Sequence, residues 1–365
     1  MKNIKKKVVQ GILCTTAVTL LSFLIGIRTP KIEENNATEQ KQFEQSTLNI
    51  LTANVARGQG HEVYVSNFLA SPFLKQLEPK KNEGSLHALE ELIIQENIDL
   101  AFFQEIENSF IAGEHQPRRL AQNTQLPNYV FAPNFAHQYL AQFPFTDGNA
   151  VIGRSQFYDS QRLSLESEKK LGLSTVTNLV VGSKGILYTK IFYKNQPIHL
   201  FCIHLSSSDT MLFGNERESE FKAVFKYVAA HTPAIIAGDF NTIPLSAQRY
   251  PFSKSKYLGE KSWAIAQKIL DDEGVTLQYD SRLELFNPEG EFSYQGTFVG
   301  SVSPDKLGHK ADLPDSKETI DYILIAGRES DSLQLKLEET HVDLTHYYSD
   351  HAPVLGKVKI VEKKR

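Results

Sequence analysis

Residues 234–244 read AIIAGDFNTIP, an apolar run that ends in a glycine followed by two polar side chains. Such a run is typical of a strand buried on both faces of its sheet. Gly238 predicts a turn, after which Asp239 and Asn241 point toward one side of the strand's end. An Asp-x-Asn pair is also ordinary turn chemistry. Because it follows so apolar a strand, we interpret it as the most specific candidate site in the chain.

Short β-rich runs separated by helical patterns extend this layout along the chain. Strands are predicted at Thr47–Val55, Asp99–Gln104, Asn149–Ile152, Gly185–Tyr193, Pro197–His204, Pro233–Ala237, Thr319–Ile325 and Ala352–Ile360. Apolar side chains follow helical spacing within residues 86–96 and 221–228. The apolar strands predict sheets buried on both faces, so helices should cover a central pair of sheets in an α+β fold.

Two polar side chains end predicted strands in the first third of the chain. Asn54 closes the run that starts at Thr47, and an asparagine in that place is more often a satisfied polar end than a ligand. Glu105 follows the apolar strand LAFFQ of residues 100–104. A carboxylate there is costly to bury unless it is paired or binds a metal, so Glu105 is a candidate ligand.

Three further strand ends carry carboxylate or imidazole groups. His204 ends its predicted strand, whereas His199 points to the opposite face and is interpreted as an ordinary structural histidine. Asp321 places a charge inside a strand pattern, where it needs a partner. Asp350 and His351 are adjacent before the last strand and offer a metal ligand together with a general acid or base.

Read in order, these groups resemble the motif series of the endonuclease/exonuclease/phosphatase superfamily. The resemblance spans residues 47–360 and is carried by Asn54, Gln104-Glu105, His204-Leu205, Gly238-Asp239-Phe240-Asn241, Ile320-Asp321-Tyr322 and Ser349-Asp350-His351. It implies the DNase I-like fold, a four-layer sandwich of two packed mixed β-sheets flanked by helices. It also implies a divalent-metal-dependent phosphoesterase that hydrolyses a phosphodiester by metal-assisted attack of water.

The resemblance further implies how a metal is held. Glu105 would bind Mg²⁺, and Asn54 and Asp350 would complete or support the site. Oxygen ligands and few protein carboxylates suit Mg²⁺, and Mn²⁺ or another divalent cation fits the same ligand set. The expected cofactor is therefore a divalent cation, Mg²⁺ first.

The remaining motif residues are implied to act on the substrate. Asp239 and His351 are alternatives for the group that activates the water, and Asp321 would hydrogen-bond to the His351 ring to fix its tautomer. His204 and Asn241 would contact the phosphate oxygens. The division of labour between base and orienting group stays open at this point.

Nucleic acid and phospholipid are alternative substrates. Thr242 and Ile243 follow Asn241 where an inositol 5-phosphatase would continue with Tyr-Arg, which speaks against that branch. Weak local likeness to bacterial sphingomyelinases lies in residues 51–55, 184–190 and 206–209. Residues 148–152, in contrast, resemble a segment found across family members of many activities. A different class, a tethered binding module that has lost catalysis, is disfavoured because the implied catalytic residues are all present.

The N-terminus differs in composition from the rest of the chain. Four lysines within Lys2–Lys7 precede the uncharged run Val8–Ile27, whose twenty residues would form about 30 Å of helix, enough to span a bilayer. A cleaved signal peptide should end its apolar stretch in small residues, whereas here Leu24-Ile25-Gly26-Ile27 leads directly into Arg28. We therefore predict that residues 1–28 are a membrane anchor or uncleaved signal segment. The domain would then lie outside the cytoplasm, and would be secreted if the segment is cleaved.

Composition, charge and cysteine content limit what the residues after the N-terminal segment can form. Residues 29–46 are polar and are predicted to be a linker, with the catalytic domain at 47–365. Residues 1–45 carry seven Lys or Arg and four Asp or Glu, so 32 basic and 39 acidic residues follow and give a net charge near −7. This balance weighs against a tight, non-specific nucleic-acid binder. Cys202 is the one thiol of the predicted domain, so no disulfide can form within it. Separately, the protein is expected to be a monomer.

Overall fold

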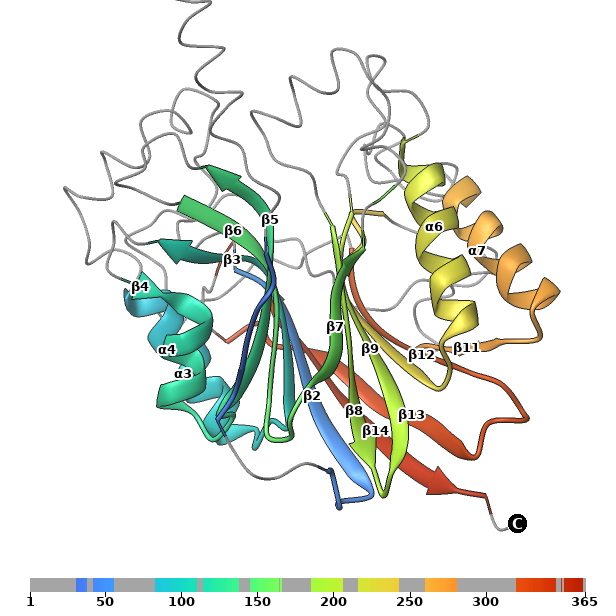
Figure 1. Cartoon of the computed structure of the whole chain (residues 1–365), viewed down its shortest axis with the longest axis horizontal. Coiled ribbons are helices and arrows are strands. Elements are labelled where there is room, and N and C mark those ends of the chain that lie inside the picture. The colour runs from blue at the N-terminus through green and yellow to red at the C-terminus, as the bar shows by residue number, and fades with distance from the viewer. Residues whose placement is uncertain are drawn as a thin grey trace, which may run out of the picture.

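Two β-sheets packed face to face form the centre of the computed structural model, with helices on both outer faces (Figure 1). The structure describes residues 31–37, 42–55, 83–109, 114–137, 145–163, 165, 185–205, 216–242, 260–280, 320–345, 349 and 351–363. The predicted α+β four-layer sandwich of mixed sheets is confirmed.

The first sheet has eight strands and contains both termini of the described fold. Its order is β1 (Glu33–Asn36), β5 (Asn128–His137), β6 (Phe145–Gly153), β3 (Leu100–Ser109), β2 (Thr47–Asn54), β14 (Val354–Glu362) and β13 (Leu333–Val342), with β4 (Glu114–His115) paired to β3. Strands β2 and β3 are parallel, and the other pairs are antiparallel.

The second sheet has six strands. Its order is β11 (Thr276–Gln278), β12 (Asp321–Gly327), β10 (Ala234–Asp239), β9 (Gln196–His204), β8 (Ile186–Tyr193) and β7 (Tyr158–Leu163). Strands β9 and β10 are parallel, so their carboxyl ends meet at the same edge of the sheet. His204 and Asp239, which were predicted to be site residues, lie at this edge.

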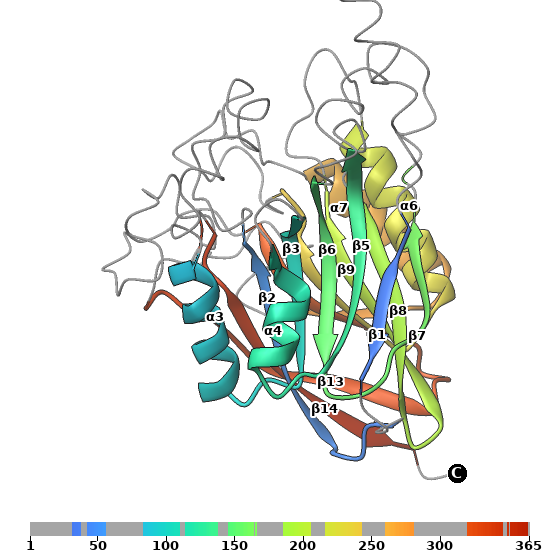
Figure 2. The same ribbon diagram turned by 60° about the vertical axis from the view of Figure 1, so that its left-hand side comes forward.

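In the part of the chain that the structure describes, helices cover the outer face of each sheet, as Figures 1 and 2 show from two directions. Helices α3 (Glu83–Gln95) and α4 (Gln116–Asn123) lie against the first sheet, and α6 (Glu216–Ala230) and α7 (Glu260–Asp272) lie against the second. The covered faces explain why the central strands are apolar on both sides.

Alternation along the central strands divides the core into layers. On β2, Leu48 and Ile50 join the core shared with the second sheet, whereas Leu51 and Ala53 join the core under α3 and α4. Because side chains alternate in a strand, Asn54 lies on the same face as Ile50 and points toward the second sheet. The apolar pattern therefore fixes which polar groups face the seam between the sheets.

All eight predicted strands and both predicted helices are present. Most strand ends shift little, but β3 continues past Gln104 to Ser109 and β6 begins at Phe145, before Asn149. One shift is informative: Asp321 opens β12 instead of lying inside a strand. The helices α4 and α7 and several edge strands were not predicted. The edge strand β11 has three residues, too few for a run of β-formers. The internal strand β5 was also not predicted, although Tyr129, Val130 and Phe131 are β-formers and gave a signal before Pro133.

The segment predicted to be a polar linker, residues 29–46, is partly built into the fold. Residues 33–36 form β1, which pairs with β5, and Phe43 is buried against the second sheet's β8. The composition is polar because β1 is an edge strand whose side chains are mostly exposed. The domain therefore begins before Thr47. The predicted anchor, residues 1–28, lies outside the described residues, among which no helix is long and apolar enough to cross a membrane.

Candidate active site

Strand register alone brings three of the predicted residues into one row. Asp239 at the end of β10 is the register partner of His204 on β9 and of Asp321 on β12. All three side chains are buried, with exposed fractions of 1%. Three titratable groups at one sheet edge are costly to bury in an otherwise apolar core, which points to a functional site.

The turn after β10 holds the Asp239 carboxylate in a fixed orientation. Gly238 has φ +142°, and a Cβ at this position would lie 2.1 Å from the Ile203 carbonyl oxygen, so a glycine is required. Asn241, at φ +49°, donates its backbone N–H to Asp239 Oδ1 (2.7 Å) and its amide to Asp239 Oδ2 (3.1 Å). Asn54 Nδ2 donates to the same Oδ2 from the first sheet (2.9 Å).

Glu105 lies at a bulge in β3. The pairing with β6 shifts register between Phe103 and Ile106, and Glu105 adopts φ +52°, a conformation rare for residues other than glycine. The Glu105 side chain is 28% exposed, and its Oε1 lies 3.5 Å from His204 Nε2. Local strain of this kind is common at functional positions, because it directs a side chain that a regular strand would place elsewhere.

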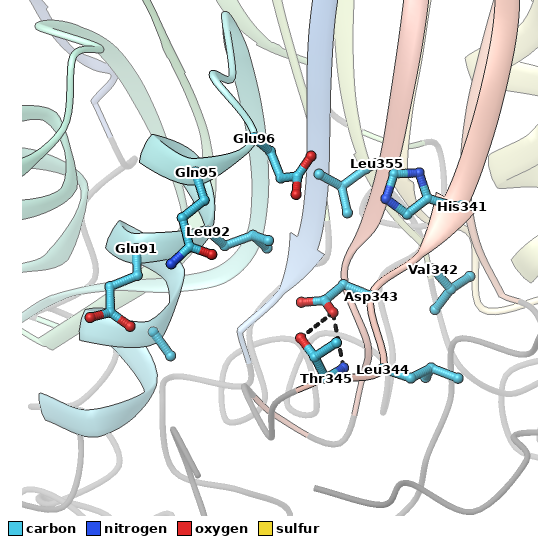
Figure 3. A pocket seen from close by; sticks show the side chains of 11 residues that line it. Glu91, Leu92, Gln95, Glu96, His341, Val342, Asp343, Leu344, Thr345 and Leu355 are labelled. Carbon is cyan, nitrogen blue, oxygen red and sulfur yellow. Dashed lines mark hydrogen bonds between the residues drawn. The ribbon is translucent and has the colours of Figure 1, made fainter. Parts of the chain in front are cut away.

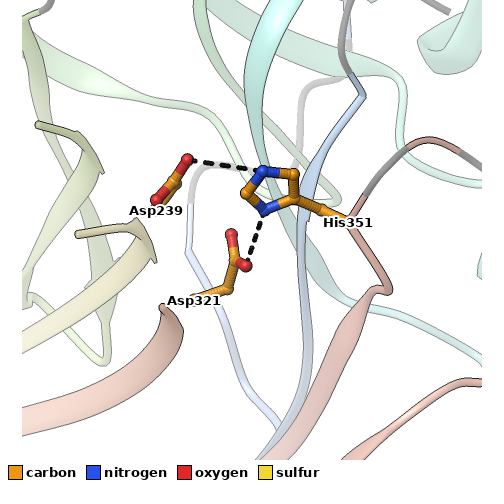
Figure 4. Close-up of side chains that lie close together, drawn as sticks. All are labelled: Asp239, Asp321 and His351. Carbon is orange, nitrogen blue, oxygen red and sulfur yellow. Dashed lines mark hydrogen bonds and ion pairs between the residues drawn. The ribbon is translucent and has the colours of Figure 1, made fainter. Parts of the chain in front are cut away.

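His351 precedes β14, and its ring contacts the Asp321 carboxylate, as Figure 4 shows. The Nδ1 atom of His351 lies 2.8 Å from Asp321 Oδ2, and both side chains are buried. On the other side of the ring, Nε2 faces Asp239 Oδ2 at 3.9 Å. Ser349 secures the turn: its Oγ accepts from the His351 N–H (2.8 Å) and donates to the Asn54 carbonyl oxygen.

Three of these contacts, Asn54–Asp239, Glu105–His204 and His351–Asp321, each join one sheet to the other. Asn54 and Glu105 come from β2 and β3 of the first sheet, and His351 precedes its strand β14. Their partners, which end or open strands of the second sheet, are Asp239, His204 and Asp321 respectively. The site therefore lies on the seam between the sheets, and its geometry depends on how the two sheets are aligned.

The arrangement fits a divalent cation. His204 Nε2 lies within 3.7 Å of Asp239 Oδ2 as well as near Glu105, so two carboxylates approach the same point from different sheets. Asp239, Asp321 and His351 also offer ligand atoms within 4.8 Å of one another. The Asp321–His351 contact has the length of a hydrogen bond and occupies one side of that ring, which fits the orienting role predicted for Asp321. Glu105, Asn54 and Asp350 stay the predicted metal ligands.

The structure brings seven of the eight predicted site residues together. These are Asn54, Glu105, His204, Asp239, Asn241, Asp321 and His351, while Asp350 lies outside the described residues. The amide of Asn241 donates to Asp239 and to the Leu205 carbonyl oxygen (2.9 Å), so here it orients Asp239. Its contact with phosphate, like that of His204, stays a prediction. The role of Ser349 in holding His351 was not predicted, and its place two positions before His351 in the same motif is the signal that the sequence offers.

A cavity of about 480 Å³ lies away from this cluster, between α3 and the end of β13 (Figure 3). Apolar side chains such as Leu92 and Leu355 line it together with the acidic groups of Glu91, Glu96 and Asp343. None of the seven described site residues borders it. These residues therefore lie at the seam and not at this cavity.

His199 lies on the outer face of β9, as its alternation predicted. Its Nδ1 lies 2.9 Å from the Tyr188 hydroxyl, and its ring stands near His231. Burial lowers the pKa of His199 to about 4, helped by the positive charges of His231 and Lys190 and opposed by Asp159. His199 is thus neutral at physiological pH and is a structural residue.

This pKa predicts a loss of stability in acid. The unfolded chain binds a proton at His199 near pH 6.5 and the folded chain only near pH 4, so unfolding becomes easier as pH falls through this window. The full shift corresponds to about 3 kcal/mol, which screening of the partly exposed ring reduces to about 1–2 kcal/mol. Urea unfolding at pH 7 and pH 4.5 should show this loss, and His199→Gln should remove that part of it. An identical pH dependence in the variant would contradict the assignment.

The sequence also matches a known family. The model of the Endonuclease/Exonuclease/phosphatase family matches residues 51–351, which includes every residue of the cluster. The chain belongs to this family. Its members are mostly phosphoesterase hydrolases that require a divalent metal. Comparison with curated proteins finds no match.

Solved structures support the fold. An endonuclease/exonuclease/phosphatase from Beutenbergia cavernae has a TM-score of 0.54 at 15% identity over 87% of this chain and 72% of that one. An endonuclease/exonuclease/phosphatase family protein from Leptotrichia buccalis has a TM-score of 0.50 at 18% identity, over 86% of this chain and 99% of that one. D. rerio TDP2 complexed with a single-strand DNA product has a TM-score of 0.51 at 15% identity, over 86% of this chain and 100% of that one. At these identities the likeness extends to the fold alone.

Proposed function

We propose that this protein is a divalent-metal-dependent phosphodiesterase whose active site is the seam cluster. The observation that carries the proposal is the buried Asp321–His351 pair facing Asp239, with His204 between Asp239 and Glu105. An acid–base pair next to a hard-oxygen site is what hydrolysis of an anionic ester requires. A bound divalent cation supplies neutralisation of the phosphate charge and a more acidic water.

The residues of the chain divide the remaining work. Glu105 would hold the divalent cation, and Asn54 fixes the Asp239 carboxylate through its amide. A water oxygen attacks phosphorus as its proton passes to His351 Nε2 or Asp239, and the leaving oxygen departs with the electron pair of its bond to phosphorus and takes a proton from solvent. Asp321 stabilises the protonated ring and keeps its Nε2 directed toward Asp239.

The substrate is either nucleic acid or phospholipid. The structure of D. rerio TDP2 with a DNA product shows that this fold accommodates a nucleic acid. The uncharged run at residues 8–27 behind four lysines favours the phospholipid alternative, because it would hold the domain at a bilayer surface. Both substrates contain the phosphodiester on which the proposed chemistry acts.

Parallel assays would identify the substrate. The full chain with Mg²⁺ is offered plasmid DNA, RNA, sphingomyelin and phosphoinositides, and the products are separated. We expect one class to be hydrolysed at a rate clearly above the others. A folded protein that hydrolyses none of the four would contradict the proposal and favour the binding module.

A further inference from the structure

A layer of polar side chains lies directly beneath the active site, in the otherwise apolar core between the sheets. It consists of Thr52 on β2, Gln104 on β3, Asn149 on β6 and Cys202 on β9, and each is at most 1% exposed. Polar groups in such a core lower stability unless they are hydrogen-bonded. This layer therefore calls for a physical reason.

Hydrogen bonds within the layer connect the two sheets. Gln104 Nε2 donates to Cys202 Sγ (3.2 Å) and lies 3.3 Å from Thr52 Oγ1. The thiol of Cys202 donates to the Phe103 carbonyl oxygen (3.4 Å), and burial raises its pKa to about 12, so it keeps its proton. Asn149 Nδ2 donates to the Gly185 carbonyl oxygen (2.7 Å), from the first sheet to the second.

Three members of the layer adjoin site residues in the sequence. Thr52 and Cys202 each precede a site residue by two positions on the same strand face, and Gln104 immediately precedes Glu105. Glu105 contacts His204 from the opposite sheet, so any sliding of the sheets changes that distance. A directional hydrogen bond resists sliding in a way that apolar contacts do not.

We propose that Gln104 and Cys202 are positioning residues, whose hydrogen bond fixes the alignment of the two sheets and thereby holds Glu105 against His204 in the metal-binding geometry. The expected effect on turnover rests on the proposed function. The expected effect on metal binding is independent of the substrate.

The test compares variants of the full chain by Mn²⁺ affinity from electron paramagnetic resonance, turnover, KM and melting temperature. Cys202→Ala removes the sulfur acceptor, Gln104→Met removes the amide at similar length, and Cys202→Ser keeps a polar partner. Val130→Ala is the matched control, since Val130 is fully buried in the same core and belongs to no polar contact of the layer.

We expect Cys202→Ala and Gln104→Met each to weaken Mn²⁺ binding and lower turnover about tenfold with KM unchanged. The double variant should lose no more Mn²⁺ affinity and turnover than the more impaired of the two single variants. Cys202→Ser should keep both quantities within about twofold of the natural protein. Val130→Ala should lower the melting temperature without changing Mn²⁺ affinity. If Gln104→Met does not fold, the difference in Mn²⁺ affinity and turnover between Cys202→Ala and Cys202→Ser tests the positioning role.

The outcomes separate this proposal from the proposed function. Unchanged Mn²⁺ affinity in Cys202→Ala, additive losses in the double variant, or an equal loss in Val130→Ala would overturn the positioning role. A natural protein that binds Mn²⁺ but cleaves no phosphodiester would refute the function while the affinities still test the positioning. A natural protein that binds no Mn²⁺ would overturn the positioning role outright.

Discussion

Replacing Glu105 with Gln should lower turnover by at least about a thousandfold and leave the fold intact. The substitution removes one negative charge from a hard-cation site and preserves shape, so the expected loss corresponds to about 4 kcal/mol of transition-state stabilisation. Gln occupies the strained backbone position of Glu105 (φ +52°) as readily as Glu does, and the side chain is partly exposed. The melting temperature should therefore change little.

Glu91→Gln provides the control for this prediction, because it makes the same chemical change at an exposed side chain on α3. It should keep full turnover. Raising the Mg²⁺ concentration should recover part of the activity of Glu105→Gln, since a weakened site fills at higher cation concentration. Full activity of Glu105→Gln at low Mg²⁺ would remove Glu105 from the metal site.

The second large effect is expected at Asp321. Asp321→Asn keeps a side chain of the same shape next to His351 Nδ1 but removes the charge that stabilises the protonated ring. We expect turnover to fall about a hundredfold or more, with KM changed much less. Steady-state kinetics and thermal unfolding of the variant measure both quantities.

A double variant distinguishes catalysis from structure at this pair. If Asp321 acts through His351, then Asp321→Asn should cost little in a His351→Ala background, because the two residues act as a unit. If Asp321 serves only to satisfy nearby backbone donors, the rate losses should be additive and Asp321→Asn should be unstable. The second pattern would leave Glu105, Asp239 and His351 as the functional set.

The ends of buried strands explain why so much of the site was predictable. An apolar run fixes a strand and its two covered faces, so a polar residue at its end has few places to go. Asp239, His204 and Asp321 each end or open such a strand, and register then places them in one row. The pairing of Asp321 with His351, which the family resemblance implied, is present at 2.8 Å.

Other features depend on contacts between segments distant in the sequence and were not predictable. Strand β1 reads EENN and exists because it pairs with β5 at the sheet edge, which no local pattern indicates. The positive φ of Glu105 follows from a bulge that the pairing with β6 imposes. Helix α7 is different: Trp263, Ala266 and Leu270 have helical spacing and are buried, so its signal was present in the sequence.

The polar layer beneath the site illustrates the same limit. Gln104 and Cys202 are 98 positions apart, and neither is unusual within its own strand pattern. Only the packing of the two sheets makes them partners. Sequence reasoning locates groups on strands, and the alignment of the sheets decides which of those groups meet.

Chelation of divalent cations tests the central claim most directly. Turnover of the substrate identified by the parallel assays is measured with Mg²⁺, after treatment with EDTA, and after Mg²⁺ is restored. A metal-dependent phosphodiesterase should lose at least about 99% of its turnover in EDTA and recover it with Mg²⁺. Undiminished hydrolysis by the metal-free protein would contradict the account.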